Sequence, residues 1–177
     1  MSSASKCRIV LSVLIFPLLA FSQDEKESAM NALAEMIGGK WVIHTKWENG
    51  GEFRQEQIFE WGLGKTIIKT TTYGTVNQET GEFGLRNEGI RAWDSAAKQM
   101  KFWEFDVFGG ITTGVCGMEG NSFYYEYEYA PEGEMQIFRD VWTKIDKNTY
   151  SYQIGIYKDG KFAKVFLEVE AKRVEKE

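Results

Sequence analysis

The sequence contains few of the residues that build disulfides, metal centres or haem sites. Among its 177 residues are two cysteines, Cys7 and Cys116, and one histidine, His44. Cys7 belongs to a segment that we expect to be removed, so no internal disulfide can form in the remaining chain. No histidine occurs late in the chain to ligate a haem, and no Gly-x-Ser-x-Gly sequence accompanies His44. We therefore predict no cofactor, no metal site and no catalytic triad, with His44 on the surface.

Long apolar runs are also scarce. The longest, residues 9–20, is about a dozen residues, whereas a membrane-spanning helix needs about 20. Basic residues precede this run, and Ala20 and Ser22 provide the small side chains that a signal peptidase reads. We predict a signal peptide over residues 1–22 and export of one domain, residues 23–177, to the periplasm or the cell exterior.

The charge of this domain excludes another class of partner. The formal net charge of −5 becomes about −7 when the two basic residues of the signal peptide are removed. An acidic protein is not attracted to nucleic acid or to anionic lipid. We expect a soluble domain that is large enough for a sizeable core, with no nucleic-acid partner and no stable membrane insertion.

The pattern after the signal peptide predicts one helix followed by strands. Residues 24–37 begin with acidic side chains, carry apolar residues at helical spacing, and end at Gly38 and Gly39, as a glycine-capped helix does. The rest of the chain alternates between apolar and polar residues in about ten segments separated by short polar turns. These predicted strands are 40–47, 53–61, 66–76, 86–94, 99–108, 111–118, 122–129, 135–144, 149–157 and 161–173.

The strand order predicts an all-β fold. The strands follow one another as a meander, and neither Pro17 nor Pro131 interrupts one. Long aromatic strands with unprotected edges would aggregate, and closing the sheet removes the edges. We therefore predict a closed antiparallel up-and-down β-barrel of about eight to ten strands, with the N-terminal helix capping one end.

The first strand carries a family resemblance. Gly39-Lys40-Trp41, after a short helix, resembles the Gly-x-Trp opening of the lipocalin-like barrels of the calycin superfamily. The chain is most similar to bacterial secreted lipocalin-like domains of unknown function, which share this opening and a central pattern matched here by Trp93-Asp94 and 102–105. The resemblance implies that the tryptophan packs inside the closed end under an arginine from the last strand, a role that Arg173 could take.

Alternation along the strands predicts which side chains face the interior. The expected interior is aromatic, with polar tips that a purely structural core rarely selects. It includes Ala163, Val165, Leu167 and Val169 from the last strand. Eight residues are predicted to line a ligand pocket: Trp47, Gln55, Gln57, Trp61, Tyr125, Tyr127, Arg139 and Tyr152.

The predicted strand 135–144 has two possible orientations. One places Arg139 inside, where it would bind a carboxylate, and the other places Asp140 and Trp142 inside, which reverses the preferred ligand charge. We expect Arg139 to face inward. Glu104 and Asp106 share a strand face that we expect to point outward, because the opposite face is the more apolar one.

These observations favour an exported, non-catalytic binding protein for a small hydrophobic or amphipathic, possibly carboxylated, ligand held inside the barrel. Two alternatives remain open. One is an isomerase or cyclase that uses pocket tyrosines, carboxylates and arginine. The other is a structural or interaction barrel with a filled core.

Overall fold

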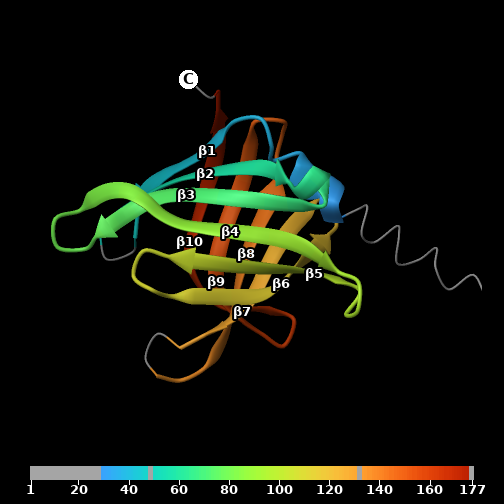
Figure 1. Cartoon of the computed structure of the whole chain (residues 1–177). Helices are drawn as coiled ribbons and strands as arrows, with labels where there is room; N and C mark the ends of the chain where they lie inside the picture. The colour runs from blue at the N-terminus through green and yellow to red at the C-terminus, as the bar shows by residue number, and fades with distance from the viewer. Residues whose placement is uncertain (1–28, 48–49, 131–132, 176–177) are drawn as a thin grey trace, which may run out of the picture.

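The computed structural model describes residues 29–47, 50–130 and 133–175 (Figure 1). The signal peptide predicted for residues 1–22 and the first part of the predicted helix, residues 24–28, lie outside this range. The described residues include no helix that is long and apolar enough to cross a membrane.

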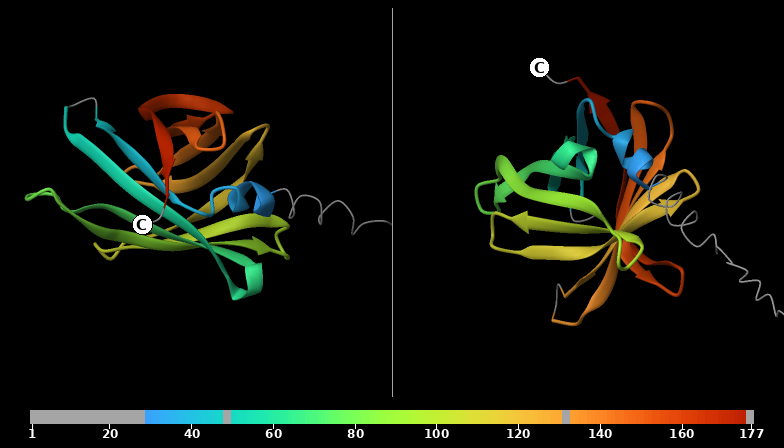
Figure 2. Two further views of the ribbon diagram at one scale, coloured as in Figure 1. Left: turned by 90° about the horizontal axis from the view of Figure 1, so that it is seen from above. Right: turned by 45° about the vertical axis from the view of Figure 1, so that its right-hand side comes forward.

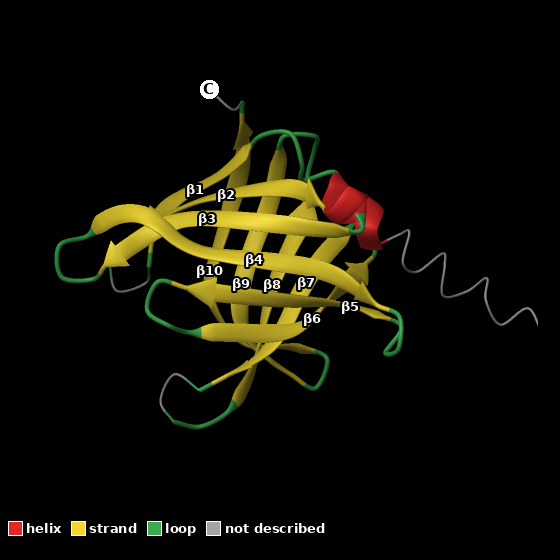
Figure 3. Cartoon of the chain, viewed as in Figure 1, coloured by secondary structure: helices red, strands yellow, loops and turns green. Residues whose placement is uncertain are grey.

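Ten antiparallel strands form a closed barrel (Figures 1 and 3). Each strand pairs with its neighbours in sequence, and β1 pairs with β10 to close the sheet. This confirms the predicted up-and-down topology. The strands are β1 Lys40–Lys46, β2 Glu52–Gly62, β3 Ile67–Asn77, β4 Glu82–Asp94, β5 Gln99–Asp106, β6 Ile111–Glu119, β7 Ser122–Tyr129, β8 Gln136–Lys144, β9 Thr149–Lys158 and β10 Lys161–Val174, with a 3-10 turn, η1 Leu63–Lys65, after β2.

The N-terminal helix closes one end of the barrel. Its described part spans residues 29–34, and Figure 2 shows it from two sides at one end of the strands. Met30, Leu33 and Met36 are buried and belong to the barrel core. Gly38 then adopts a φ of +96°, a conformation that glycine accepts without strain, and the chain enters β1.

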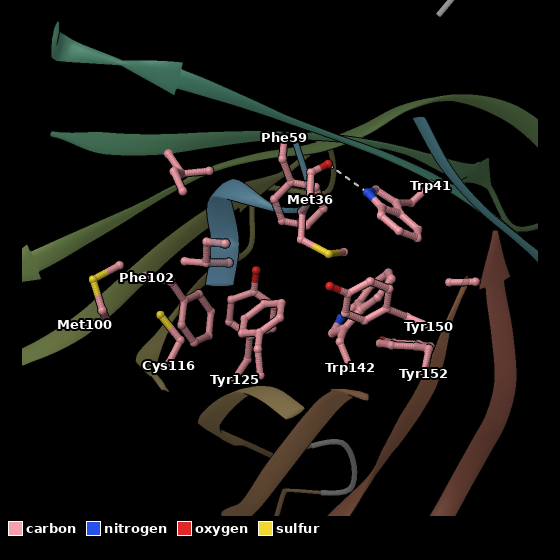
Figure 4. Close-up of a cluster of buried hydrophobic side chains, with 14 of the residues drawn as sticks. Met36, Trp41, Phe59, Met100, Phe102, Cys116, Tyr125, Trp142, Tyr150 and Tyr152 are labelled. Atoms are coloured by element: carbon pink, nitrogen blue, oxygen red, sulfur yellow. Dashed lines mark hydrogen bonds between the residues drawn. The ribbon is translucent and has the colours of Figure 1, made fainter. Parts of the chain in front are cut away.

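Trp41 joins the helix, the first strand and the last strand. Its side chain is fully buried, and its indole Nε1 donates a 2.8 Å hydrogen bond to the carbonyl oxygen of Met36 (Figure 4). The Arg173 guanidinium lies 4.6 Å from the Trp41 ring and donates a hydrogen bond to the Glu35 carbonyl oxygen. A Cβ atom at Gly39 would approach the Arg173 side chain to 2.8 Å, so the arginine packs where only glycine leaves room.

The barrel interior divides into two zones. Next to the helix, large side chains pack edge to face, as Trp41 and Tyr150 do with ring centroids 5.0 Å apart (Figure 4). This zone is a closed core that includes Phe59, Ile68, Met100, Phe123 and Trp142. Beyond it, toward the hairpins that join β1 to β2 and β5 to β6, the inward side chains become polar and surround a cavity.

The inward alternation predicted for β10 is correct only in its second half. Leu167, Val169 and Ala171 pair with inward residues of β9 and join or contact the core. Register shifts occur between Phe162 and Lys164 and between Val165 and Leu167. Each extra residue reverses the side-chain direction, so the expected inward placement of Ala163 and Val165 is wrong.

We expect the change of Trp41 to alanine to lower the free energy of unfolding by about 3–5 kcal/mol, because it removes a large buried ring and leaves a cavity. The matched control is Trp103→Ala, since Trp103 is a partly buried tryptophan on the outer face of β5. Urea denaturation of both variants measures the difference. Equal losses for the two, or a loss below about 1 kcal/mol for Trp41→Ala, would contradict the central position given to Trp41.

Candidate functional site

A cavity of about 260 Å³ lies inside the barrel, so the interior is not completely filled. Most of its lining side chains carry a polar group. The apolar surfaces come from Trp47, Phe53, Phe102, Trp142 and Ile154. The polar groups come from Gln55, Gln57, Thr72, Arg86, Asn87, Arg91, Glu104, Thr112, Tyr125, Tyr127, Asp140 and Tyr152. Such a mixture suits a small molecule with both an apolar body and polar groups.

Six of the eight residues predicted for the pocket line this cavity: Trp47, Gln55, Gln57, Tyr125, Tyr127 and Tyr152. They come from β2, β7, β9 and the residue after β1, so the alternation pattern brought together side chains that lie far apart in sequence. Trp61 packs against the core and is not part of the cavity lining. Contact of the six with a ligand stays a prediction.

Arg139 lies on the outer face of the barrel, so its expected inward orientation is wrong. Its strand partner on β7 is Glu126, an outward residue. Its guanidinium is sandwiched between the Tyr124 and Tyr157 rings at 3.8 and 4.2 Å, and its Nη2 contacts Glu119 Oε1 at 2.6 Å. These neighbours cover Arg139 almost completely, and neither the rings nor the carboxylate belongs to the cavity.

The opposite orientation of β8 places Asp140 in the cavity. The Tyr127 hydroxyl donates to Asp140 Oδ1 at 3.1 Å, and the Tyr152 hydroxyl donates to Oδ2 at 3.0 Å. Burial raises the pKa of Asp140 from its ordinary value of 3.8 to about 7, although the two tyrosine hydrogen bonds act in the other direction. Burial and the nearby Asp140 also raise the pKa of both tyrosine hydroxyls, so they remain donors.

A second polar network centres on Arg91, which is 1% exposed. All three nitrogens of its guanidinium donate: Nε to the Tyr125 hydroxyl at 2.9 Å, Nη1 to Thr70 Oγ1 and Nη2 to Glu104 Oε1. Burial opposes the charged form, but the interactions with Tyr125 and Glu104 outweigh it and raise the pKa of Arg91. The guanidinium is therefore a permanent charge that is paired inside the protein, and three of its five N–H groups donate in these bonds.

Glu104 faces the interior, contrary to the expectation for its strand. Its Oε2 accepts a 3.0 Å hydrogen bond from Asn87, while Oε1 is paired with Arg91. Gly89 provides the space, because a Cβ atom there would lie 2.5 Å from Arg91 Nη1 and 2.7 Å from Glu104 Cγ. Asp106 does not join this network; its Oδ1 accepts hydrogen bonds from the backbone of the β5–β6 turn.

Reasoning from the sequence missed Arg91, Thr70, Thr72 and Asn87. One feature of the sequence pointed to Arg91. It is a lone charged residue between Ile90 and Ala92 in a predicted strand, so its side chain must face either the solvent or a buried partner of opposite charge. Its partner Glu104 lies on the next strand, and the register of that hairpin is needed to pair them.

The rim of the cavity carries an aromatic pair and a cation. Trp47 and Phe53 pack edge to face with centroids 4.8 Å apart. Arg86 lines the cavity and lies 5.8 Å from the Phe108 ring. In the described part of the chain, Arg86 forms no ion pair.

Two residues considered for chemistry have structural surroundings. Cys116 is buried, and burial raises the pKa of its thiol to about 12, so it is not a nucleophile at neutral pH. His44 is exposed on the outer face and lies 3.0 Å from Glu52. Over the described ranges, no group of three or more histidine, cysteine, aspartate or glutamate residues could hold a metal ion.

Comparison with protein-family models gave no match to this chain, and comparison with curated protein sequences gave none either. The barrel topology and the packing of Trp41 under Arg173 are compatible with the lipocalin-like architecture that the Gly-x-Trp opening resembles. Function must therefore be argued from the cavity itself.

The cavity presents polar groups and one carboxyl group with a raised pKa. Asp140 has a pKa near neutrality, and two hydroxyl donors keep its carboxyl group in place. Arg91 and Glu104 neutralise each other, so in the described structure Asp140 is the acidic group of the cavity without an ion-pair partner, and Arg86 at the rim is the cation without one. A bound donor or cation would stabilise the ionised form of Asp140.

We expect Asp140 to make the protein less stable as the pH rises from about 4 to about 7. In this interval the folded state holds a proton on Asp140 that the unfolded state has already lost, so folding is penalised when that proton leaves. Between pH 5 and pH 8 the wild type should lose about 2–3 kcal/mol more unfolding free energy than Asp140→Asn.

Urea denaturation at both pH values measures this difference. The control is Glu128→Gln, which removes an acidic group from the exposed outer face of β7 and should leave the wild-type pH profile unchanged. Parallel profiles for the wild type and Asp140→Asn would show that Asp140 does not carry a raised pKa.

Proposed function

We propose that this protein binds a small amphipathic molecule inside the barrel. The observation that carries the proposal is the 260 Å³ cavity, which combines aromatic surfaces with a carboxyl group that is held by two tyrosine hydroxyls and by no ion pair in the described structure. A barrel that served only as a scaffold would gain stability by filling this volume with apolar side chains. In this barrel polar side chains line the volume and lower the stability of the folded state, and a bound ligand would raise that stability again.

The proposed ligand differs in charge from the one first expected. A carboxylated ligand was predicted because Arg139 was expected in the pocket, and Arg139 lies outside it. The cationic side chain in the deep part of the cavity, Arg91, already has its charge paired with Glu104, and three of its five N–H groups donate to Thr70, Glu104 and Tyr125. The polar groups that remain for a ligand are the carboxyl of Asp140, the amide of Gln55 and rim groups such as Arg86, whereas the Gln57 amide donates to Thr72 Oγ1 at 3.2 Å.

We also propose that the protein is an exported lipocalin-like barrel. The sequence of residues 1–22 supports export, and the fold with its Gly39-x-Trp41 opening supports the lipocalin-like relationship. If cleavage follows Ser22, the intact mass of protein isolated from the cells that make it corresponds to a chain beginning at Gln23. A mass that retains the first 22 residues would contradict export by this signal.

We expect Thr112→Trp to abolish ligand binding. Thr112 lines the cavity from β6, so an indole at this position occupies the space that the ligand needs. The matched control is Thr113→Trp, since Thr113 is the adjacent exposed residue on the same strand and its side chain points away from the cavity. Ligand-observed NMR against a library of small aromatic amphipaths measures binding by the wild type and both variants.

The outcome separates the possible functions. Binding that Thr112→Trp removes and Thr113→Trp retains supports the proposal, whereas equal binding by both variants, or none by the wild type, contradicts it. Recovery of the bound molecule unchanged after incubation supports a binding protein. Conversion to an isomer or cyclised product would favour the enzyme alternative, in which Asp140, Tyr127 and Tyr152 act on the substrate.

A further inference from the structure

The cavity contains a carboxyl group without a basic partner. Its two acidic residues differ in their partners: Glu104 is paired with Arg91, while the hydrogen bonds of Asp140 in the described structure come from the Tyr127 and Tyr152 hydroxyls. A buried carboxylate without a cation is costly, so such a group either holds a proton or awaits a positive partner. A ligand can supply that partner because Asp140 lines the open volume.

The geometry around Asp140 leaves room for donors from a ligand. Tyr127 donates to one carboxylate oxygen from β7, and Tyr152 donates to the other from β9, so the carboxyl group is held between them. Each oxygen of an ionised carboxylate accepts about two hydrogen bonds. One acceptor position per oxygen therefore remains for a donor that enters the cavity.

The walls beside Asp140 are aromatic. Trp142 follows on the same face of β8 and packs against Tyr152 with centroids 4.8 Å apart. Aromatic faces attract a cation electrostatically, and the attraction strengthens when the cation is withdrawn from water. Two tyrosines, a tryptophan and a carboxylate together form a site whose chemistry matches an ammonium group.

We propose that the ligand is a small organic cation, with an ammonium group on an apolar body, that places its charge against Asp140 between Tyr127, Tyr152 and Trp142. This inference rests on the proposed binding function and names the class of ligand. The apolar body then occupies the volume toward Phe102 and Ile154, which line the same cavity.

The charges that face this site favour a cation over an anion. From the elements packed around it, Tyr125 and Tyr127 on β7 and Tyr152 on β9 are neutral, while Arg91 on β4 and Glu104 on β5 cancel one another. Arg86, at the rim, is the remaining cation of the cavity. The ionised Asp140 is therefore the dominant charge at the proposed site.

The test compares three probes of similar shape and different charge: 2-phenylethylamine, 2-phenylethanol and 3-phenylpropanoate. Titration calorimetry at pH 8 should show the amine binding at least about tenfold more tightly than the alcohol, and the carboxylate most weakly. Asp140→Asn should weaken amine binding at least about tenfold and leave alcohol binding nearly unchanged. Glu128→Gln, which removes an equal charge from the outer face, should bind all three probes as the wild type does.

The pH dependence provides an independent readout on the wild type. The amine stays protonated at pH 6 and pH 8, whereas Asp140, with a pKa of about 7, is mostly protonated at pH 6. Amine affinity should therefore fall about tenfold from pH 8 to pH 6, while alcohol affinity should not. This measurement needs no variant, so it tests the proposal even if Asp140→Asn does not fold.

Three results would overturn the inference. They are an amine that binds no better than the alcohol, an Asp140→Asn variant that keeps full amine affinity, and amine binding that is equal at pH 6 and pH 8. The proposed function survives these results if Thr112→Trp still blocks binding of the alcohol or carboxylate probe and Thr113→Trp does not. Absence of binding by all three probes to the wild type overturns the amine inference, and the library screen then decides the binding function separately.

Discussion

The pairing of β1 with β10 is the contact on which the rest of the barrel depends. It joins the first strand to the last, and only three residue pairs form it, from Lys40↔Val174 to Val42↔Lys172. Without it the sheet would have two open edges, and its interior would be exposed to water. The short seam is reinforced by Trp41 and Arg173, which connect both strands to the end of the helix. Trp41 thus contributes to closure of the sheet, to the attachment of the N-terminal helix and to the closed core next to that helix.

The apolar core at the helix end of the barrel provides stability, so the other end can carry polar side chains around a cavity. The closed core beside the helix contains large side chains such as Phe59, Trp142 and Tyr150 in edge-to-face contact, and it provides the hydrophobic stabilisation. The polar zone is organised by two buried networks, one around Arg91 and one around Asp140, whose members come from strands on different sides of the barrel. The first network is electrically balanced, and the second is not. This difference distinguishes a structural polar cluster from a candidate binding group.

Much of this arrangement could be predicted from the sequence, because strand alternation and turn spacing are local properties. These local properties were sufficient to predict the barrel, the capping helix and the inward orientation of Tyr125 and Tyr127 on β7. They failed where both faces of a strand carry similar residues. In β8 either orientation places one charge inside, and only the pairing of Tyr125 with Asp140 resolves the choice. On β5 both faces carry two large apolar residues, and Glu104 lies on the inner face with Met100 and Phe102, where it pairs with Arg91.

The absence of a side chain at Gly89 has an evolutionary consequence. The guanidinium of Arg91 and the carboxylate stem of Glu104 occupy the space that any larger residue at position 89 would require. A lineage that exchanges this glycine must give up or rebuild the ion pair beside it, and it must also shift the Trp103 carbonyl oxygen, which a Cβ atom at position 89 would approach to 2.7 Å. We therefore expect the three positions, although they lie on two strands, to be retained together. Among distant descendants of this barrel, their joint retention would mark those that still keep the same polar interior.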